Sequence, residues 1–379
     1  MKPALLLYCQ HSLGLGHFVR SLALAEAMTE HFAVTFFNGG PVPEGLALPQ
    51  GVRFEHLPPL RMLEDGSLAG EGDTAAIFAA RRARMMEVAE ETAAAVLLVE
   101  LYPFGRKKFA VEIDPLIARV RARGGRVACS VRDVLVTARA DQARHDDRAA
   151  CALNAAFDTV LVHTDPRLFV LSDSFQPQIP LTIPVEHTGY VVRGDGACAA
   201  AVLPDGPTLV AAGGGAVGHA LYHAAINAQP RLMAQRGWTM TLVAGPLFPE
   251  QDWRALLERA RGVAGLTLVR AVPSMAPLLA ASGRFVGQCG YNSALEVCQS
   301  GLPTLFVPFA RGKESEQTCR ARKLTELGLA DWLPEPELDG DALADRLLTL
   351  QLPPPGTSIE LDGARRSARL LKELTPCNA

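Results

Sequence analysis

Short apolar runs alternate along the whole chain with longer segments of helical periodicity. After the first run, Phe18, Leu22 and Ala25 recur at helical spacing among strong helix formers. This alternation is typical of a parallel sheet with helices on both faces. We therefore predict strands at residues 4–9, 33–37, 95–99, 126–131 and 159–162 in the first half, and at 208–212, 239–243, 266–269, 284–286 and 304–307 in the second.

The pattern restarts after a segment rich in glycine and charge at 191–196. A chain of 379 residues is also too long for one small core. We predict two doubly wound α/β domains, at residues 1–193 and 194–361. An amphipathic helix is expected in the remaining residues, 362–379.

Composition narrows the class of protein. Apolar residues make up 49% of the chain and charged residues 20%, which is typical of a globular protein. The net charge of -3 argues against a nucleic-acid partner. No apolar run approaches the ~20 residues of a membrane span, and no secretory leader opens the chain. The eight cysteines show no metal-type spacing, so we expect reduced thiols, no metal and no cofactor in a cytoplasmic protein.

The loop after the first predicted strand, residues 11–20, carries chemistry-bearing groups. Gly14 and Gly16 allow the backbone to approach a ligand at the start of the next helix. Val19 stands where a dinucleotide-binding loop needs its third glycine, which argues against NAD. His17 has an ordinary pKa near ~6.5, so it suits a general base acting on a hydroxyl or on water. The alternative is that His17 only caps the helix or the turn.

Two other predicted strand ends carry charge. Glu100 follows the strand at 95–99, and Arg132 and Asp133 follow the strand at 126–131. Ligands of open α/β sheets bind beyond the carboxyl ends of the strands. Glu100 or Asp133 could assist proton removal, and Arg132 could meet phosphate or an acidic acceptor. The alternatives are a solvated strand end for Glu100 and a helix-entry ion pair for Arg132 and Asp133.

The second half contains two candidate phosphate sites. The first is the turn Gly213, Gly214 and Gly215, whose backbone amides can surround a diphosphate. The second is the predicted helix start near Asn292 and Ser293. Glu296 lies one turn further and could bind ribose hydroxyls, or it could form a capping box with Ser293.

Several motifs of the second half resemble the carboxyl-terminal, donor-binding domain of family 28 glycosyltransferases. The motifs are Gly290-x5-Glu296, Ser300-Gly301-Leu302-Pro303, Val307-Pro308-Phe309 and Glu316-Gln317. Gly14-x-Gly16-His17-x-x-Arg20 resembles the first loop of these enzymes. As a whole, the chain most resembles a bacterial group of predicted glycosyltransferases whose acceptor is unassigned.

The resemblance implies a GT-B fold, with two Rossmann-like domains that face each other across a cleft. The last helix of this fold often crosses back to the first domain. The resemblance further implies that Val272 meets the uracil through its main chain and that Glu316 and Gln317 contact sugar hydroxyls. It also adds Gly16 to the donor-binding residues and Arg20 to the phosphate or acceptor contacts.

The sequence therefore predicts a hexosyltransferase that uses a nucleotide sugar, with uridine favoured as its base. Transfer to an acceptor hydroxyl would invert the sugar carbon without a divalent metal. One alternative is a UDP-sugar hydrolase or hydrolysing epimerase on the same scaffold, and another is a non-catalytic nucleotide-sugar-binding module. The acceptor could be a small molecule, a glycan or a lipid. Two basic segments, 81–86 and 106–109, are candidates for peripheral membrane contact.

Overall fold

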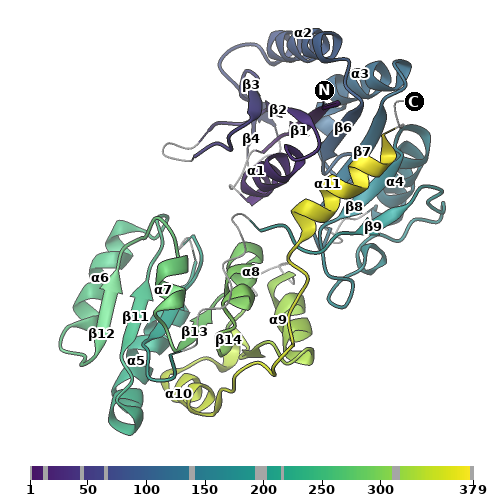
Figure 1. Ribbon diagram of the computed structural model, residues 1–379. Coiled ribbons are helices and arrows are strands. Elements are labelled where there is room, and N and C mark those ends of the chain that lie inside the picture. The colour runs from purple at the N-terminus through teal and green to yellow at the C-terminus, as the bar shows by residue number, and fades with distance from the viewer. Residues whose placement is uncertain are drawn as a thin grey trace. The chain divides into compact units, whose positions relative to one another are not determined.

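The computed structural model describes residues 2–11, 16–42, 47–63, 67–135, 141–192, 203–214, 217–309 and 316–375. The chain forms two compact units, one of Met1–Gly194 with Glu360–Ala379 and one of Asp195–Ile359. We call them the N-terminal unit and the C-terminal unit (Figure 1). Each has its own parallel sheet. Most of the predicted linker at 191–196 lies outside the described residues.

A parallel sheet in the order β3-β2-β1-β6-β7-β8-β9 forms the centre of the N-terminal unit. Its strands are β1 (Ala4–Cys9), β2 (Ala33–Asn38), β3 (Val52–His56), β6 (Val96–Glu100), β7 (Arg126–Val131), β8 (Thr159–Val162) and β9 (Val185–His187). A separate small hairpin joins β4 (Arg61–Met62) to β5 (Leu68–Ala69).

Helices cover both faces of this sheet (Figure 1). They are α1 (Gly16–Met28), α2 (Thr74–Thr92), α3 (Ala110–Ala122), α4 (Gln142–Ala156) and α11 (Gly363–Leu374), with short 3-10 turns η1 (Lys107–Phe109) and η2 (Leu171–Asp173). Successive strand residues point to opposite faces. Accordingly, Leu5 and Leu7 pack with α1 and α11, whereas Leu6 and Tyr8 pack with α2, α3 and α4. Burial on both faces explains why these strands are almost continuously apolar.

The C-terminal unit repeats this architecture with the strand order β12-β11-β10-β13-β14-β15. Its strands are β10 (Thr208–Ala211), β11 (Met240–Val243), β12 (Leu266–Val269), β13 (Arg284–Gly287), β14 (Thr304–Phe306) and β15 (Asp331–Trp332). Its helices are α5 (His219–Arg236), α6 (Glu250–Ala260), α7 (Ala276–Ala280), α8 (Tyr291–Ser300), α9 (Glu316–Glu326) and α10 (Gly340–Thr349), with the 3-10 turn η3 (Glu335–Glu337). All strand pairs are parallel.

The predicted α/β class with two doubly wound sheets is confirmed, and all ten predicted strands exist, with boundaries within one residue. The apolar pattern does not predict the short hairpin strands β4 and β5, nor the edge strands β3, β9 and β15. The edge strands are only half-buried and carry polar or charged residues, so no apolar run marks them.

The C-terminal helix α11 packs against α1 within the N-terminal unit, and Ala368 and Leu371 contribute to the shared core. Its approach is fixed by backbone hydrogen bonds from Tyr190 N to Glu360 O (2.7 Å) and from Gly363 N to Tyr190 O (3.0 Å). The returning chain is thereby anchored beside the segment that follows β9.

In each sheet, the chain adds strands first on one side of its initial strand and then on the other side. The initial strand and its later neighbour therefore form a topological switch point. In the N-terminal unit, β1 pairs with β2 on one side and with β6 on the other. In the C-terminal unit, β10 pairs with β11 and with β13 in the same way. The loops after the two strands diverge at such a switch point and leave a crevice at the carboxyl edge of the sheet. Both candidate sites lie at these edges.

Candidate active site

In the N-terminal unit, His17 and Glu100 meet at the switch point between β1 and β6. His17 is the second residue of α1, and Glu100 is the last residue of β6. His17 Nδ1 lies 2.5 Å from Glu100 Oε1, and Arg20 Nη2 donates to the same oxygen at 2.7 Å. Arg106 Nη2 lies 3.6 Å from the other carboxylate oxygen. The alternative of a solvated strand end is therefore wrong for Glu100, which is 1% exposed.

The charge state of the pair follows from its surroundings. Burial by itself would raise the pKa of Glu100, but His17, Arg20 and Arg106 outweigh burial and hold this pKa at about 2. Burial lowers the pKa of His17 below its ordinary value, and Arg20 and Arg106 act in the same direction against the attraction of Glu100. Near pH 7 the carboxylate is thus ionised and the imidazole neutral.

This charge state assigns the tautomer of His17. An ionised carboxylate can only accept hydrogen bonds, so Nδ1 of His17 carries the proton and Nε2 keeps its lone pair. The His17 side chain is 23% exposed, whereas Arg20 and Glu100 are buried. The imidazole is therefore the member of the cluster that solvent or a substrate can reach, and the geometry suits a general base oriented by a carboxylate.

Arg132 and Asp133 directly follow β7, and α4 is described from Gln142 onward. Residues 136–140 lie outside the described residues, so the alternative of a helix-entry ion pair stays open. Arg132 Nε lies 3.5 Å from Asp133 Oδ1, and Asp133 is fully buried. Their proposed roles in proton removal and in phosphate or acceptor binding stay predictions.

The sequence analysis missed a buried hydrogen-bond chain next along the same edge. Ser130 Oγ and His163 Nε2 are 2.7 Å apart, and His163 Nδ1 lies 2.9 Å from Thr188 Oγ1. Ser130 pairs in register with Glu100 across β6 and β7. Burial lowers the pKa of His163 to about 3, so this ring stays neutral. Its position directly after β8 was the available sequence signal.

In the C-terminal unit, the glycine turn after β10 meets two other backbone segments. Gly213 has φ +63°, and a Cβ atom at this position would lie 3.6 Å from Ser293 Oγ of α8. A Cβ atom at Gly245, in the loop after β11, would lie 2.7 Å from the Gly214 backbone. The absence of side chains thus lets these segments converge beside the start of α8. Gly215 lies outside the described residues.

The helix α8 begins at Tyr291, with Gly290 as its N-cap residue and no side-chain hydrogen bond to cap it among the described residues. The capping-box interpretation is wrong, because Ser293 is already the third helical residue. Among the described residues, a Cβ atom at Gly290 would meet nothing within 4 Å, so space is open beside the N-cap residue. The first N–H groups of α8 are therefore available to an anion.

The remaining donor candidates lie along the same edge of the sheet. Asn292 and Glu296 are exposed on α8, and within the described chain neither side chain forms a hydrogen bond or ion pair. Loss of hydration raises the pKa of the Glu296 carboxyl above its ordinary value. Val272 is half-buried in the segment between β12 and α7. Their contacts with a nucleotide stay predictions.

Glu316 and Gln317 open α9, and both already have protein partners. Gln317 Oε1 accepts a hydrogen bond from Phe309 N (3.1 Å), and Glu316 Oε1 accepts one from Arg320 Nη2 (2.6 Å). The sequence analysis assigned no role to Arg320, which is 1% exposed.

Neither basic segment is available as a whole for membrane contact. Arg81 is fully buried and binds Glu112, Arg84 pairs with Glu55 and Glu87, and Met85 lies in the core. In the second segment, Phe109 is buried and Arg106 lies beside Glu100. The exposed members of the two segments are Arg82, Ala83, Lys107 and Lys108. Among the described helices, none combines the length and apolar character needed to cross a membrane.

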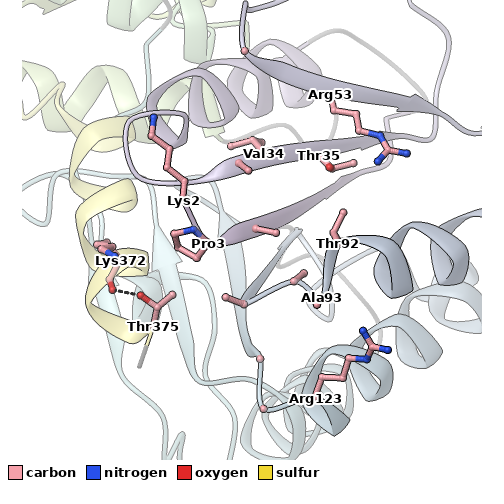
Figure 2. A pocket seen from close by; sticks show the side chains of 17 residues that line it. Lys2, Pro3, Val34, Thr35, Arg53, Thr92, Ala93, Arg123, Lys372 and Thr375 are labelled. Carbon is pink, nitrogen blue, oxygen red and sulfur yellow. Dashed lines mark hydrogen bonds between the residues drawn. The ribbon is translucent and has the colours of Figure 1, made fainter. Parts of the chain in front are cut away.

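A hollow of about 1120 Å³ opens at the amino ends of the strands of the N-terminal unit, away from His17 and Glu100. Figure 2 shows that its cationic side chains do not converge on a common point. Arg53 pairs with Glu55 and Glu91, Arg123 pairs with Glu90, and Lys2 Nζ donates to the Thr29 carbonyl. The hollow therefore offers no converging cations to an anionic ligand.

Within the described ranges, no group of three or more His, Cys, Asp or Glu side chains is arranged to hold a metal ion. One Asp-x-Asp triplet, Asp339-Gly340-Asp341, occurs in the sequence. Asp339 Oδ1 accepts a hydrogen bond from Ala342 N (2.8 Å) and caps α10.

Solved structures share this fold over nearly the whole chain. UGT2 of Phytolacca americana, complexed with UDP-2fluoro-glucose and pterostilbene, matches 98% of this chain and 94% of its own with a TM-score of 0.59 and 17% identity. Acinetobacter baumannii MurG matches 100% of this chain and 97% of its own with a TM-score of 0.55 and 15% identity. The fold is therefore that of the GT-B glycosyltransferases.

The second half is assigned more narrowly by sequence. Residues 209–368 match the model of the glycosyltransferase family 28 C-terminal domain. The UDP-N-acetylglucosamine--N-acetylmuramyl-(pentapeptide) pyrophosphoryl-undecaprenol N-acetylglucosamine transferase of Lactococcus lactis subsp. cremoris is 28% identical over 141 residues, 37% of this chain. The enzyme of the same name from Latilactobacillus sakei is 30% identical over 146 residues, 38% of this chain. These matches span only 39% and 40% of the relatives' own lengths.

Proposed function

We propose that this chain is an inverting glycosyltransferase, which moves a hexose or N-acetylhexosamine from a UDP-sugar to an acceptor hydroxyl. The observation that carries the proposal is the neutral His17 imidazole, which ionised Glu100 orients at the carboxyl edge of its sheet. The family 28 domain at residues 209–368 supports a nucleotide sugar as the donor.

In this mechanism the C-terminal unit binds the donor. The open amino end of α8 and the turn at Gly213 and Gly214 bind the diphosphate, and Glu296 binds the ribose hydroxyls. Val272 holds the base, whereas Glu316 and Gln317 contact the sugar. Negative charge grows on the leaving diphosphate during transfer, and the backbone N–H groups stabilise it without a divalent metal.

In the N-terminal unit, Nε2 of His17 removes the proton of the acceptor hydroxyl as that oxygen attacks the sugar carbon. The proton stays on the imidazole, and the Glu100 carboxylate stabilises the resulting imidazolium. Attack on the face opposite the diphosphate inverts the configuration. The mechanism requires His17 and the bound donor to meet during turnover.

The names of the relatives suggest which compounds to test first. The names of the curated relatives give UDP-N-acetylglucosamine as the donor and a pyrophosphoryl-undecaprenol compound as the acceptor, and the UGT2 structure is a complex with UDP-2fluoro-glucose and pterostilbene. Small molecules, glycans and lipids therefore all belong in the acceptor panel. A cytoplasmic location is part of the proposal, and Arg82, Lys107 and Lys108 are the exposed basic residues that the two candidate segments offer for peripheral membrane contact.

The proposal is tested by ligand-induced stabilisation, followed by turnover. A UDP-sugar present at 100 times its dissociation constant should raise the free energy of unfolding by ~2.7 kcal/mol. UDP release should then require an acceptor. Failure of every sugar nucleotide to stabilise the protein would refute donor binding. Equally rapid UDP release without an acceptor would instead favour the hydrolase.

A further inference from the structure

The buried guanidinium of Arg320 connects the amino ends of two helices in the C-terminal unit. Its Nη1 donates a hydrogen bond to the Cys289 carbonyl (2.7 Å), and its Nη2 donates to Glu316 Oε1 (2.6 Å). Its guanidinium carbon also lies 5.7 Å from the centre of the Tyr291 ring. Cys289 and Tyr291 flank the N-cap residue of α8, and Glu316 is the first residue of α9.

The position of this charge is electrostatically unusual. The amino end of a helix already carries partial positive charge, and the buried Arg320 cation beside the turn that precedes α8 adds to that charge. Glu316, whose side chain is 27% exposed, pairs with this guanidinium. The space beside Gly290 lies next to the amino end of α8 and close to the Arg320 guanidinium, and positive charge at both favours an anion.

The geometry also couples two parts of the proposed donor site. One planar guanidinium fixes the carbonyl before α8 and the carboxylate that opens α9 at the same time. A lysine ammonium carries the charge, but it cannot match this two-sided planar geometry. The orientation of Glu316 and the direction of the first N–H groups of α8 thus depend on the same side chain.

We propose that Arg320 is a positioning residue for the diphosphate and the sugar of the donor. It holds the turn at residues 289–291 and the Glu316 carboxylate in register, and it adds positive charge near the phosphate site. This inference deepens the proposed function and rests on it.

The experiment measures the dissociation constants of uridine, UMP, UDP and UDP-N-acetylglucosamine for wild type, Arg320→Lys and Arg320→Met. The matched control is Arg322→Met, which removes an exposed guanidinium from the same helix, where it lies over Trp332. Arg320→Met should weaken UDP and the UDP-sugar by at least about tenfold, since charge-assisted hydrogen bonds and charge are lost. The affinity of Arg320→Lys for UDP and for the UDP-sugar should lie between those of Arg320→Met and wild type. Uridine binding should change by less than about twofold, and the control should match wild type.

An equal loss of uridine and UDP binding would show general loosening and overturn the inference, as would unchanged UDP binding. If Arg320→Met does not fold, the inference is tested with Arg320→Lys alone. A ratio of UDP to uridine affinity below that of wild type supports the inference, and an unchanged ratio overturns it. Wild-type protein that binds none of the four ligands would refute the proposed function, and the inference would fall with it. Wild-type binding without the selective loss refutes only the role of Arg320.

Discussion

The two units place different chemistry at the same position of the same architecture. At the β1/β6 switch point, a carboxylate forms ion pairs with two arginines and a hydrogen bond with a neutral histidine. At the β10/β13 switch point, glycines and the uncapped start of α8 present backbone groups. The doubly wound topology therefore determines where a ligand can bind, and the residues that follow each strand determine what it can do.

The two sites also differ in how complete they are without a ligand. Arg20 and Glu100 are buried and paired, so the orientation of His17 is set in advance. Asn292 and Glu296 are exposed, and each lacks a side-chain partner in the described part of the chain. We infer that the first site is preorganised for proton transfer, whereas the second is completed by its ligand. The following predictions separate these two behaviours.

The largest expected effect is on turnover. His17→Ala should lower kcat by about 10² to 10⁴-fold, because it removes the general base. Donor affinity should stay within about twofold, because the donor binds in the other unit. Transfer rates and donor titrations measured on the same preparations check both values, with the partly exposed His31→Ala as the control. Turnover that survives His17→Ala would remove the basis for a catalytic site in the N-terminal unit.

Acid stability should distinguish the units next. The pKa of Glu100 is about 2 in the folded protein and near ~4.3 when unfolded, so its contribution is present above pH ~4.3 and lost as the pH falls towards 2. The loss amounts to about 3 kcal/mol for the N-terminal unit.

Hydrogen exchange of the β6 amides measures the stability of the N-terminal unit, whereas the fluorescence of Trp238, Trp253 and Trp332 follows unfolding of the C-terminal unit only. Glu100→Gln should flatten the acid dependence of β6 and leave the fluorescence unchanged. A steep dependence retained in Glu100→Gln would contradict the assignment.

A third substitution should raise the stability of the C-terminal unit while weakening UDP binding there. An aspartate can replace Gly290 without strain, because the position has room for a side chain and its backbone angles, φ -64° and ψ 153°, suit any residue. The carboxylate would cap α8 and stabilise it by a few tenths of a kcal/mol. It would also occupy the proposed phosphate site and weaken UDP binding by at least about tenfold. Thermal unfolding and UDP titration check the two signs, with Gly290→Ala as the uncharged control. Full UDP affinity in Gly290→Asp would place the diphosphate elsewhere.

The sequence predicted much of the fold because burial on both faces of a parallel sheet leaves uninterrupted apolar runs. It also placed Glu100 at the carboxyl edge, since a polar residue directly after such a run must lie there, and it placed His17 in the connection from the first strand to its helix. The start of α8 was placed too late, because Ser293 is a better N-cap residue than Gly290 by propensity alone. The turn after β13 overrides this preference.

Contacts between residues distant in sequence were not predictable in the same way. Ser130 and His163 are separated by 33 residues, and Cys289 and Arg320 by 31. No local pattern distinguishes a buried, paired arginine on a helix from a solvated one. For the same reason Arg81, which binds Glu112, was interpreted as a surface charge.

The smallest expected effect tests how the charges around His17 tune its proton affinity. Arg106 disfavours the imidazolium and so contributes to the lowered pKa of His17. Arg106→Gln should therefore raise this pKa by less than about one unit. Because only the neutral ring acts as a base, the acid limb of kcat/KM should move to higher pH by the same amount, with the plateau at high pH unchanged. Lys2→Gln changes the net charge equally at the opposite edge of the sheet and should leave the limb in place. A shift of the limb to lower pH in Arg106→Gln would show that a group other than His17 supplies the base.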